Sequence, residues 1–276
     1  IEDFITAMHW AGLTIDEGVT MENDQVTQIG EVGPYVQSER LPIYKQYAEE
    51  LIANGHAYYC FCSKERLDEL RKFQELNKLA PGYDGHCREG NLDEARAQVA
   101  SGTPYVVRMK MPRTGVTVFD DLIRGRVEFQ NSVVDDQVLM KTDGFPTYHL
   151  AVVVDDRLMS CTHVIRGEEW LSSTPKHVVL YQMFGWEAPL FAHLPILVNA
   201  DKKKLSKRHG DVAVRDYKAK GYLPEALVNF VAFLGWNPGT DQELFTLDEL
   251  CAEFSFERVS KSPAVFNLEK LAWYNR

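Results

Sequence analysis

The apolar residues at the start of the chain follow the i, i+3, i+4, i+7 spacing of an amphipathic helix, and they are Ile1, Phe4, Ile5, Met8 and Ala11. The same spacing returns in residues 38–55, where Pro42 suits the first turn of a helix and Gly55 suits its end. The polar residues 16–37 between these helices are predicted to form a long loop. The N-terminal part of the chain is therefore predicted to be helix, loop and helix.

The helical spacing of apolar residues ends before residue 57. Residues 57–62 are predicted to form a strand, and the next helix is predicted to begin after Ser63, with Leu67, Leu70 and Phe73 facing inward. Residues 104–130 alternate apolar and polar side chains with a period of two. That period indicates a small antiparallel β region.

Strands and helices alternate from residue 143 onward. Strands are predicted over Tyr148–Val154, Thr162–Arg166 and His193–Val198, with a helix after Pro175. This alternation favours a parallel α/β architecture. After residue 211 the pattern is mainly helical.

Composition narrows the class of protein. The chain has 276 residues and a net charge of −10, which argues against indiscriminate binding to nucleic-acid phosphates. No window approaches the roughly 18 consecutive apolar residues of a membrane span, so no membrane partner is expected. Five cysteines, an odd number, predict no disulfide framework and favour a reducing compartment. We expect the cytoplasm, with an organellar matrix as the open alternative.

The segment 201–210 concentrates positive charge in this acidic chain. Lys204 and Lys207 lie three residues apart with Ser206 between them, so one loop can direct two ammonium groups and a hydroxyl at one anion. The segment also follows a predicted strand, where α/β sheets place ligand-binding loops. The alternative is a solvated basic turn.

The residues Lys204-Leu205-Ser206-Lys207-Arg208 resemble the KMSKS signature of class I aminoacyl-tRNA synthetases. Further blocks resemble glutamyl-tRNA synthetases in the same order along the chain, and they cover residues 33–41, 144–151, 153–156, 163–175, 222–229 and 266–273. Because the series is collinear and extends over essentially all 276 residues, the chain is identified as a member of this family.

The resemblance implies ATP-dependent attachment of glutamate to tRNA-Glu through a glutamyl-adenylate. The implied partners are ATP with Mg²⁺, L-glutamate and the acceptor stem of tRNA-Glu, and a monomer is expected. Lys207 and Lys204 are the implied catalytic residues, because charge builds on phosphoryl oxygens as two anions meet. The implied ATP-binding residues are Lys204, Leu205, Ser206, Lys207, Arg208, Glu169 and Trp170.

Tyr148 and Arg166 are the implied glutamate-binding residues, since a guanidinium grips a carboxylate through paired hydrogen bonds. The alternative for Arg166 is an ion pair with Glu168 or Asp155. Asp155 and Asp156 are interpreted as capping a turn after a buried strand rather than as a metal site, and we assign them no catalytic role.

The expected fold is the latter part of a class I Rossmann-type nucleotide fold with a mixed α+β insertion, followed by a helical region. Residues 1–58 are expected to form the first half of a partial catalytic domain, and residues 59–145 an acceptor-stem-binding insertion. Residues 146–205 are expected to form the second half of the catalytic domain, and residues 206–276 the KMSKS-type loop and a stem-contact region.

Two parts of the family pattern are absent from the 276 residues: the His-x-Gly-His motif and the anticodon-binding region. The first residue also lies inside a predicted helix that has no N-cap before it. We therefore expect a fragment that does not activate glutamate by itself.

Cys60, Cys62 and Cys87 resemble the zinc site that some bacterial glutamyl-tRNA synthetases carry in this insertion. The position that holds the fourth ligand in that pattern, a histidine, is Glu89 here, and His86 lies on the other side of Cys87. Zn²⁺ prefers four N or S ligands in structural sites. A degenerate zinc site and three unligated thiols both remain open.

Several basic residues lie on or beside the predicted β region, namely Arg108, Lys110, Arg113, Arg124 and Arg126. The resemblance places them in the insertion that holds the tRNA acceptor end, whereas alternating charges on a sheet are usually its solvated face. Two alternative functions also remain: a paralogue that glutamylates a modified base of tRNA-Asp, and a non-catalytic RNA-binding remnant.

Overall fold

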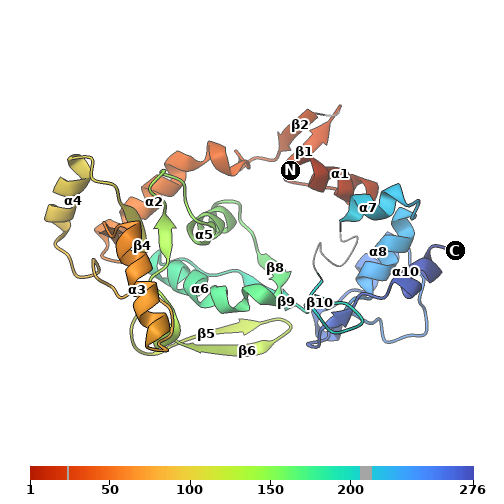
Figure 1. Cartoon of the computed structure of the whole chain (residues 1–276). Coiled ribbons are helices and arrows are strands. Elements are labelled where there is room, and N and C mark those ends of the chain that lie inside the picture. The colour runs from red at the N-terminus through yellow and green to blue at the C-terminus, as the bar shows by residue number, and fades with distance from the viewer. Residues whose placement is uncertain (24, 206–212) are drawn as a thin grey trace.

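The computed structural model describes residues 1–23, 25–205 and 213–276 (Figure 1). The predicted first helix is confirmed as α1 (Glu2–Trp10). The loop predicted over residues 16–37 is wrong in part, because β1 (Gly18–Glu22) and β2 (Gln25–Ile29) pair there as an antiparallel hairpin. Valine and threonine in both strands explain the extended backbone, since β-branched side chains favour strands.

Two of the next helices begin at residues that favour the start of a helix. The short 3-10 helix η1 (Gln37–Glu39) leads into α2 (Leu41–Ala53), which carries a proline in its first turn, and β3 (Ala57–Cys60) follows. Ser63 caps α3 (Lys64–Leu76) by accepting a hydrogen bond from the Arg66 amide at 3.2 Å. The inward orientation predicted for Phe73 is wrong, because this side chain is 58% exposed. The helix α4 (Leu92–Ala100) follows α3 along the chain.

The strands of the predicted antiparallel region belong to two different sheets. One sheet has the order β3, β4 (Val106–Met109), β7 (Val138–Met140), with antiparallel pairs, and η2 (Asn131–Val133) precedes β7. The other has the order β6 (Gly125–Gln130), β5 (Val116–Asp121), β9 (Leu190–Leu194), β8 (His163–Gly167). In it the β5–β6 pair is antiparallel, whereas β5–β9 and β8–β9 are parallel. The predicted parallel α/β unit is therefore confirmed as β8, α6 (Thr174–Met183) and β9.

The strand predicted over Tyr148–Val154 is wrong, because these residues begin the helix α5 (Tyr148–Leu158). A short apolar run does not distinguish a buried strand from a buried helix by its periodicity. The helix contacts α2 on one side and α6 on another, so most of its apolar side chains are buried. The 3-10 helix η3 (Glu168–Ser173) then connects β8 to α6.

The predicted strand His193–Val198 is interrupted at Pro195, which lies between β9 and the short β10 (Leu197–Val198). The strand β10 pairs in parallel with β11 (Ala264–Val265). Predicted helical structure after residue 211 is confirmed for the described part by α7 (Val214–Ala219), α8 (Pro224–Ala232), α9 (Leu247–Glu253), η5 (Phe256–Arg258) and α10 (Leu268–Tyr274). In Figure 1, α8 and α10 lie at the opposite end of the molecule from α3 and α4.

The main apolar core lies between α2, α5 and α6 and the two larger sheets. Its fully buried side chains include Tyr44, Leu51, Met109, Leu150, Leu180 and Phe191. This core supports the carboxyl end of β8 and the first turn of α5, where the candidate site lies. Within the described residues, no helix has the length and apolar character needed to cross a bilayer.

Candidate functional site

Arg166 lies at the carboxyl end of β8, half-buried, and its guanidinium contacts three other side chains. Nη1 donates a hydrogen bond to the Tyr148 hydroxyl at 3.0 Å. Nη2 lies 3.3 Å from the Thr174 hydroxyl and 3.0 Å from His177 Nδ1. Nε is buried without an acceptor among the described residues. One N–H of Nη1 and the N–H of Nε are therefore left for another acceptor.

The alternative ion pairs predicted for Arg166 are wrong. Glu168 pairs with Arg124, and Asp155 pairs with Arg40 at 2.7 Å. Within residues 1–23, 25–205 and 213–276, no carboxylate lies at ion-pair distance from the Arg166 guanidinium. A half-buried cation without a carboxylate partner is a binding group for an anion.

A pair of histidines lies beside Arg166. His177 Nε2 lies 2.9 Å from His149 Nδ1, and the side chain of His177 is almost fully buried. Burial lowers the pKa of His149 to about 4, assisted by the positive charges of Lys176 and Arg166. Burial, with Arg166 next, also lowers the pKa of His177 well below its usual value. Both rings are thus neutral at pH 7.

Two aromatic rings flank the guanidinium on its exposed side. The ring centroids of Tyr148 and Trp170 are 4.6 Å apart, and Trp170 lies with its ring centroid 5.9 Å from the guanidinium carbon of Arg166. The two aromatic residues remain 42% and 37% exposed. The hydrogen bond between Arg166 and Tyr148 therefore lies on the exposed side of the site.

Lys204 is held beside this site by a tight turn after β10. The turn closes through a hydrogen bond from the Lys203 amide to the Asn199 side chain at 2.9 Å, with Lys202 in the left-handed region at φ 60°. Leu205 donates to the Leu197 carbonyl at 3.0 Å, which folds the segment back on β10. The predicted residues Ser206, Lys207 and Arg208 lie outside the described residues.

The ammonium group of Lys204 lies 3.2 Å from Glu169 Oε1. A backbone hydrogen bond within Glu169 and the ammonium group of Lys204 lower the pKa of that carboxyl. Because Glu169 and Trp170 are adjacent in η3, the lysine turn and the Arg166 site meet at this helix. The structure thus brings Tyr148, Arg166, Glu169, Trp170 and Lys204 to one region of the molecule.

Gly167 is a residue that the sequence argument missed. A Cβ atom built on Gly167 would overlap the carboxylate of Glu169. The carboxylate folds back over this glycine, which leaves it facing Lys204. The signal available in the sequence was a glycine directly after the strand and before two glutamates.

The three predicted metal-ligating cysteines lie together. The Sγ atoms of Cys60, Cys62 and Cys87 are all within 4.8 Å of one another. The hydroxyl of Tyr83, which the sequence argument did not consider, lies 3.3 Å from the Cys60 Sγ and 3.4 Å from the Cys62 Sγ. Glu89 instead pairs with Lys110 at 2.9 Å. The fold assembles three sulfurs and one phenol oxygen, which matches a structural Zn²⁺ site in the number of donors, with the phenol in the place of the usual fourth N or S ligand.

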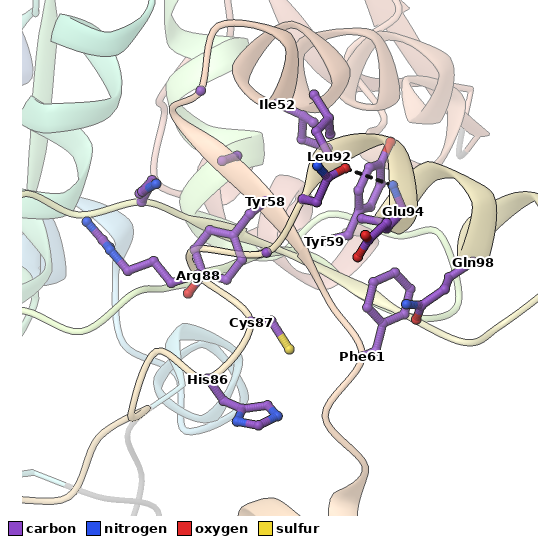
Figure 2. Close-up of a pocket in the computed structure, with 16 residues that line it drawn as sticks. Ile52, Tyr58, Tyr59, Phe61, His86, Cys87, Arg88, Leu92, Glu94 and Gln98 are labelled. Carbon is purple, nitrogen blue, oxygen red and sulfur yellow. Dashed lines mark hydrogen bonds between the residues drawn. The ribbon is translucent and has the colours of Figure 1, made fainter.

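The thiols of this group differ in acidity. Burial raises the pKa of Cys60, but hydrogen bonds with the Tyr83 hydroxyl, the Cys62 backbone and Arg108 outweigh it, so the net shift is downward. Burial and the neighbouring Cys60 raise the pKa of Cys62 to about 11. A cavity of about 290 Å³ lies between β3, α4 and the 86–90 loop. Cys87 is one of the residues that line it (Figure 2).

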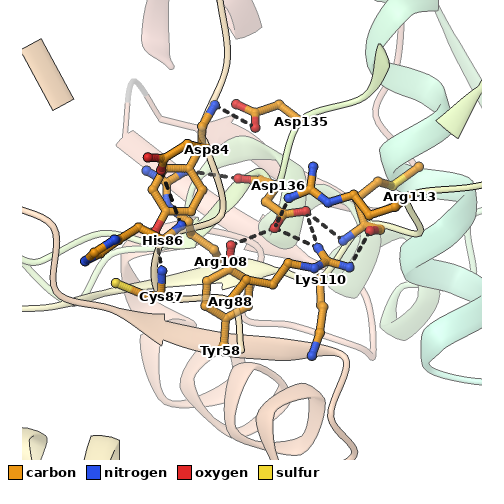
Figure 3. A network of polar contacts seen from close by, with 12 residues as sticks. Tyr58, Asp84, His86, Cys87, Arg88, Arg108, Lys110, Arg113, Asp135 and Asp136 are labelled. Atoms are coloured by element: carbon orange, nitrogen blue, oxygen red, sulfur yellow. Dashed lines mark hydrogen bonds and ion pairs between the residues drawn. The ribbon is translucent and has the colours of Figure 1, made fainter. Parts of the chain in front are cut away.

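Asp136 holds the loops around the cysteines together (Figure 3). Its carboxylate is fully buried and accepts hydrogen bonds from Arg88 Nη1 at 2.6 Å, from the Tyr58 hydroxyl at 2.6 Å and from the Met111 amide at 3.0 Å. Arg108 donates to the Asp136 backbone carbonyl at 3.0 Å and to Cys60 Sγ at 3.4 Å.

Two of the basic residues that were predicted to contact RNA or to lie on the solvated face of the sheet are buried instead. Arg108 is 7% exposed, and Arg124 is largely buried against Glu168. Neither belongs to a solvated face of the sheet, and neither is free to contact RNA. The side chains of Arg113 and Arg126 remain 45% and 65% exposed.

The chain has a parallel β8–α6–β9 unit, a guanidinium at the carboxyl end of β8 and a lysine-bearing turn after β10. This is the arrangement of a Rossmann-type α/β fold that binds its ligands at the carboxyl ends of its strands. The family model for the catalytic domain of class I tRNA synthetases (E and Q) matches residues 1–273. The chain belongs to this family.

Several curated relatives carry the name glutamate–tRNA ligase. The chain is 58% identical to the one from Clostridioides difficile and 55% identical to the one from Alkaliphilus metalliredigens, in both cases over 100% of this chain and 56% of the relative. The chain therefore spans about half the length of these relatives.

Solved structures agree with this similarity. A glutamate–tRNA synthetase from Elizabethkingia anophelis superposes with a TM-score of 0.87 at 38% identity, over 98% of this chain and 58% of that one. A glutamate tRNA ligase from Elizabethkingia meningosepticum, solved in complex with its amino acid, gives 0.88 at 38% identity, over 99% and 58%. The mixed α/β fold of the class I catalytic domain is thereby confirmed.

Proposed function

We propose that the chain is the part of a glutamate–tRNA ligase that binds glutamate and the phosphates of ATP. The observation that carries the proposal is the Arg166 guanidinium, which has N–H groups to spare and no carboxylate partner among the described residues. Tyr148 and Trp170 form an accessible wall beside it. Glutamate has a second carboxylate that distinguishes it from most amino acids, and a guanidinium is suited to bind such a group.

The reaction joins two anions. An oxygen of the glutamate α-carboxylate attacks the α-phosphorus of ATP, and pyrophosphate leaves with the electrons of the broken P–O bond. A ribose hydroxyl at the tRNA 3′ end then attacks the glutamyl carbonyl, and AMP leaves. Positive charge near the phosphates is required in the first step. Lys204 supplies such charge from the turn after β10, and Mg²⁺ bound with ATP would neutralise phosphate oxygens.

Pyrophosphate exchange tests the proposal, with the full-length polypeptide that contains these 276 residues. Wild-type protein is expected to exchange pyrophosphate into ATP only when glutamate is present. Arg166→Ala is expected to raise the KM for glutamate by about 10- to 100-fold, because hydrogen bonds to charged groups contribute about 1.5–3 kcal/mol. The matched control is Arg126→Ala, an exposed arginine of β6 paired with Glu128.

Three results would contradict the proposal: no exchange with glutamate, exchange with another amino acid, or an unchanged KM for glutamate in Arg166→Ala. Transfer of glutamate to tRNA-Asp rather than tRNA-Glu would instead support the paralogue that modifies a base. Binding of RNA without any exchange would support the non-catalytic alternative.

We also propose that Cys60, Cys62, Cys87 and Tyr83 hold one Zn²⁺ ion. The support is the proximity of these four donors, which come from β3 and from the loop before α4. A bound ion would connect these two segments and stabilise the insertion over residues 59–145, where we place the acceptor-stem contact. The metal content of purified protein, measured by mass spectrometry, tests this. We expect one zinc per chain, near zero in Cys62→Ser, and no change in the exposed control Cys251→Ser.

A further inference from the structure

A buried row of polar side chains runs from Arg166 toward the interior, across β9 to β5. Thr174 Oγ1 lies 3.3 Å from Arg166 Nη2 and 3.1 Å from His193 Nε2. His193 Nδ1 lies 2.6 Å from Asp121 Oδ2, and both of these side chains are 0% exposed. Thr174 is equally buried. The row therefore connects the guanidinium to a carboxylate in the core through two intervening side chains.

The hydrogen-bond partners determine where the protons of this row lie. Burial raises the pKa of Asp121, but hydrogen bonds from His193 and from the Arg124 and Ile123 amides outweigh it, and the net shift is downward. The carboxylate is therefore ionised and accepts, so His193 carries a proton on Nδ1.

Thr174 has one hydroxyl proton and two neighbours that can accept it. His193 Nε2 lies at 3.1 Å, whereas the Trp170 carbonyl lies at 3.3 Å. The hydroxyl donates to the Trp170 carbonyl, and the direction of its contact with His193 Nε2 follows the tautomer of that ring. In either case a lone pair of Thr174 accepts from Arg166 Nη2. The row thus links Arg166 through Thr174 and His193 to Asp121 by contacts of 3.3, 3.1 and 2.6 Å. Hydrogen bonds connected in a chain polarise one another.

This arrangement differs from a direct ion pair in one functional respect. A carboxylate in contact with Arg166 would occupy the N–H groups and the charge that an anionic ligand needs. Two side chains, His193 and Thr174, separate Asp121 from Arg166. They link the carboxylate to one N–H of Nη2, and the other N–H of Nη2 contacts His177. The guanidinium plane is thus held in place, and one N–H of Nη1 remains available on the exposed side, whereas Nε is buried without an acceptor among the described residues.

We propose that Thr174, His193 and Asp121 are positioning residues that orient the Arg166 guanidinium for one carboxylate of glutamate. The proposal rests on the proposed function, because it assigns a purpose to the same guanidinium. It goes further by making the selectivity for an acidic amino acid depend on a buried carboxylate of β5. That carboxylate lies 45 residues before Arg166 and does not touch it.

The test measures the KM for glutamate and the KM for ATP separately by pyrophosphate exchange, again with the full-length polypeptide that contains these residues. Thr174→Val keeps the side-chain shape and removes the hydroxyl, and it is expected to raise the KM for glutamate by about 10-fold, the loss of one hydrogen bond to a charged group. The KM for ATP is expected to stay unchanged. Thr174→Ser restores the hydroxyl and is expected to restore the KM for glutamate.

Asp121→Asn supplies a second, independent variant. Its amide keeps the size of the carboxylate but has one oxygen in place of two. That oxygen cannot accept both from the Ile123 and Arg124 amides, as Oδ1 does, and from His193 Nδ1, as Oδ2 does, and the charge at the end of the row is gone. We expect an increase of about 3- to 10-fold in the KM for glutamate, with the KM for ATP unchanged. The melting temperature of each variant, followed by circular dichroism, shows whether its fold is retained. If Thr174→Val does not fold, Asp121→Asn decides the question.

The possible outcomes separate this proposal from the proposed function. An unchanged KM for glutamate in folded Thr174→Val and Asp121→Asn overturns the positioning proposal, while a raised KM in Arg166→Ala still supports the glutamate site. Equal increases in both KM values, or a defect that Thr174→Ser does not repair, indicate a general packing role and also overturn it. If Arg166→Ala itself leaves the KM for glutamate unchanged, the proposed function fails first.

Discussion

Arg40 and Asp155 form an ion pair that joins the N-terminus of α2 to α5. Arg40 Nε donates to Asp155 Oδ1 at 2.7 Å, and the side chains are 1% and 15% exposed. The Tyr44 hydroxyl donates to the other carboxylate oxygen at 2.7 Å. The interpretation of Asp155 as the cap of a turn is therefore wrong, because the residue lies in a helix and faces a neighbouring one. The pair fixes the helix whose first residue is Tyr148.

Replacing Asp155 by Ala is expected to lower the free energy of unfolding by about 3–5 kcal/mol. The reason is that the buried guanidinium of Arg40 would lose its counter-charge. Urea denaturation measures the change. Glu128→Ala is the matched control, because it breaks an exposed pair with Arg126, and a loss below about 1 kcal/mol is expected there. Equal losses in the two variants would contradict the assignment.

Gly167→Ala is expected to weaken ATP binding. The added methyl group would displace the carboxylate of Glu169 and with it the Lys204 ammonium group. We expect the KM for ATP in pyrophosphate exchange to rise by about 3- to 10-fold, the range of one exposed charged contact. Gly82→Ala is the control, since a Cβ atom there meets nothing closer than 3.9 Å. An unchanged KM for ATP would show that the position of Glu169 has no effect on the phosphates.

Asp136→Asn is expected to destabilise the cysteine-bearing part of the chain by about 3–5 kcal/mol, because Arg88 would lose its buried counter-ion and keep only the exposed Glu89, at 3.4 Å. The variant should also expose the thiols, so Cys60 and Cys62 should react faster with a thiol reagent in the absence of metal. Asp68→Asn, which alters the exposed pair with Arg71, serves as the control and should leave both measurements unchanged. Wild-type thiol reactivity in Asp136→Asn would contradict the role of the carboxylate.

His149 makes the stability depend on pH in a defined direction. Its pKa is about 4 in the folded protein, below the usual value of 6.5, so the unfolded chain binds a proton first as the pH falls. The contribution of His149 is therefore present above pH 6.5 and is lost between about pH 6.5 and 4. We expect the stability difference between wild type and His149→Asn to fall by about 2 kcal/mol from pH 7.5 to 5. A pH-independent difference would contradict this.

Asp156 must be separated from that effect, because it acts in the opposite direction. Burial raises the pKa of this carboxyl to about 6, so the folded protein binds its proton first, and stability is gained as the pH falls from about 6 to 3.8. Wild-type stability alone would show the two effects partly cancelled. Comparison with Asp156→Asn over the same pH range should therefore give a difference of the opposite sign.

Local patterns in the sequence determined several helices and the parallel sheet unit of this protein. The spacing of apolar residues predicted α1 and α2, and the cap at Ser63 predicted the start of α3. The alternation from residue 143 onward predicted the parallel β8–α6–β9 unit, although its first strand is a helix. Each of these features depends on interactions within a few residues of chain, which a linear pattern can carry. The collinear motifs likewise led to the family without any coordinates.

Tertiary structure decided the features that depend on packing and on distant partners. The run Tyr148–Val154 became a helix because α2 and α6 cover it, and its periodicity could not indicate this. Tyr83 lies beside the cysteines, and Asp121 is linked to Arg166 through His193 and Thr174. These residues are so far apart in the sequence that no local pattern indicates the contacts. Contacts of this kind form only when the core brings strands and loops together, which is why the partners of the charged groups were the least predictable part of the molecule.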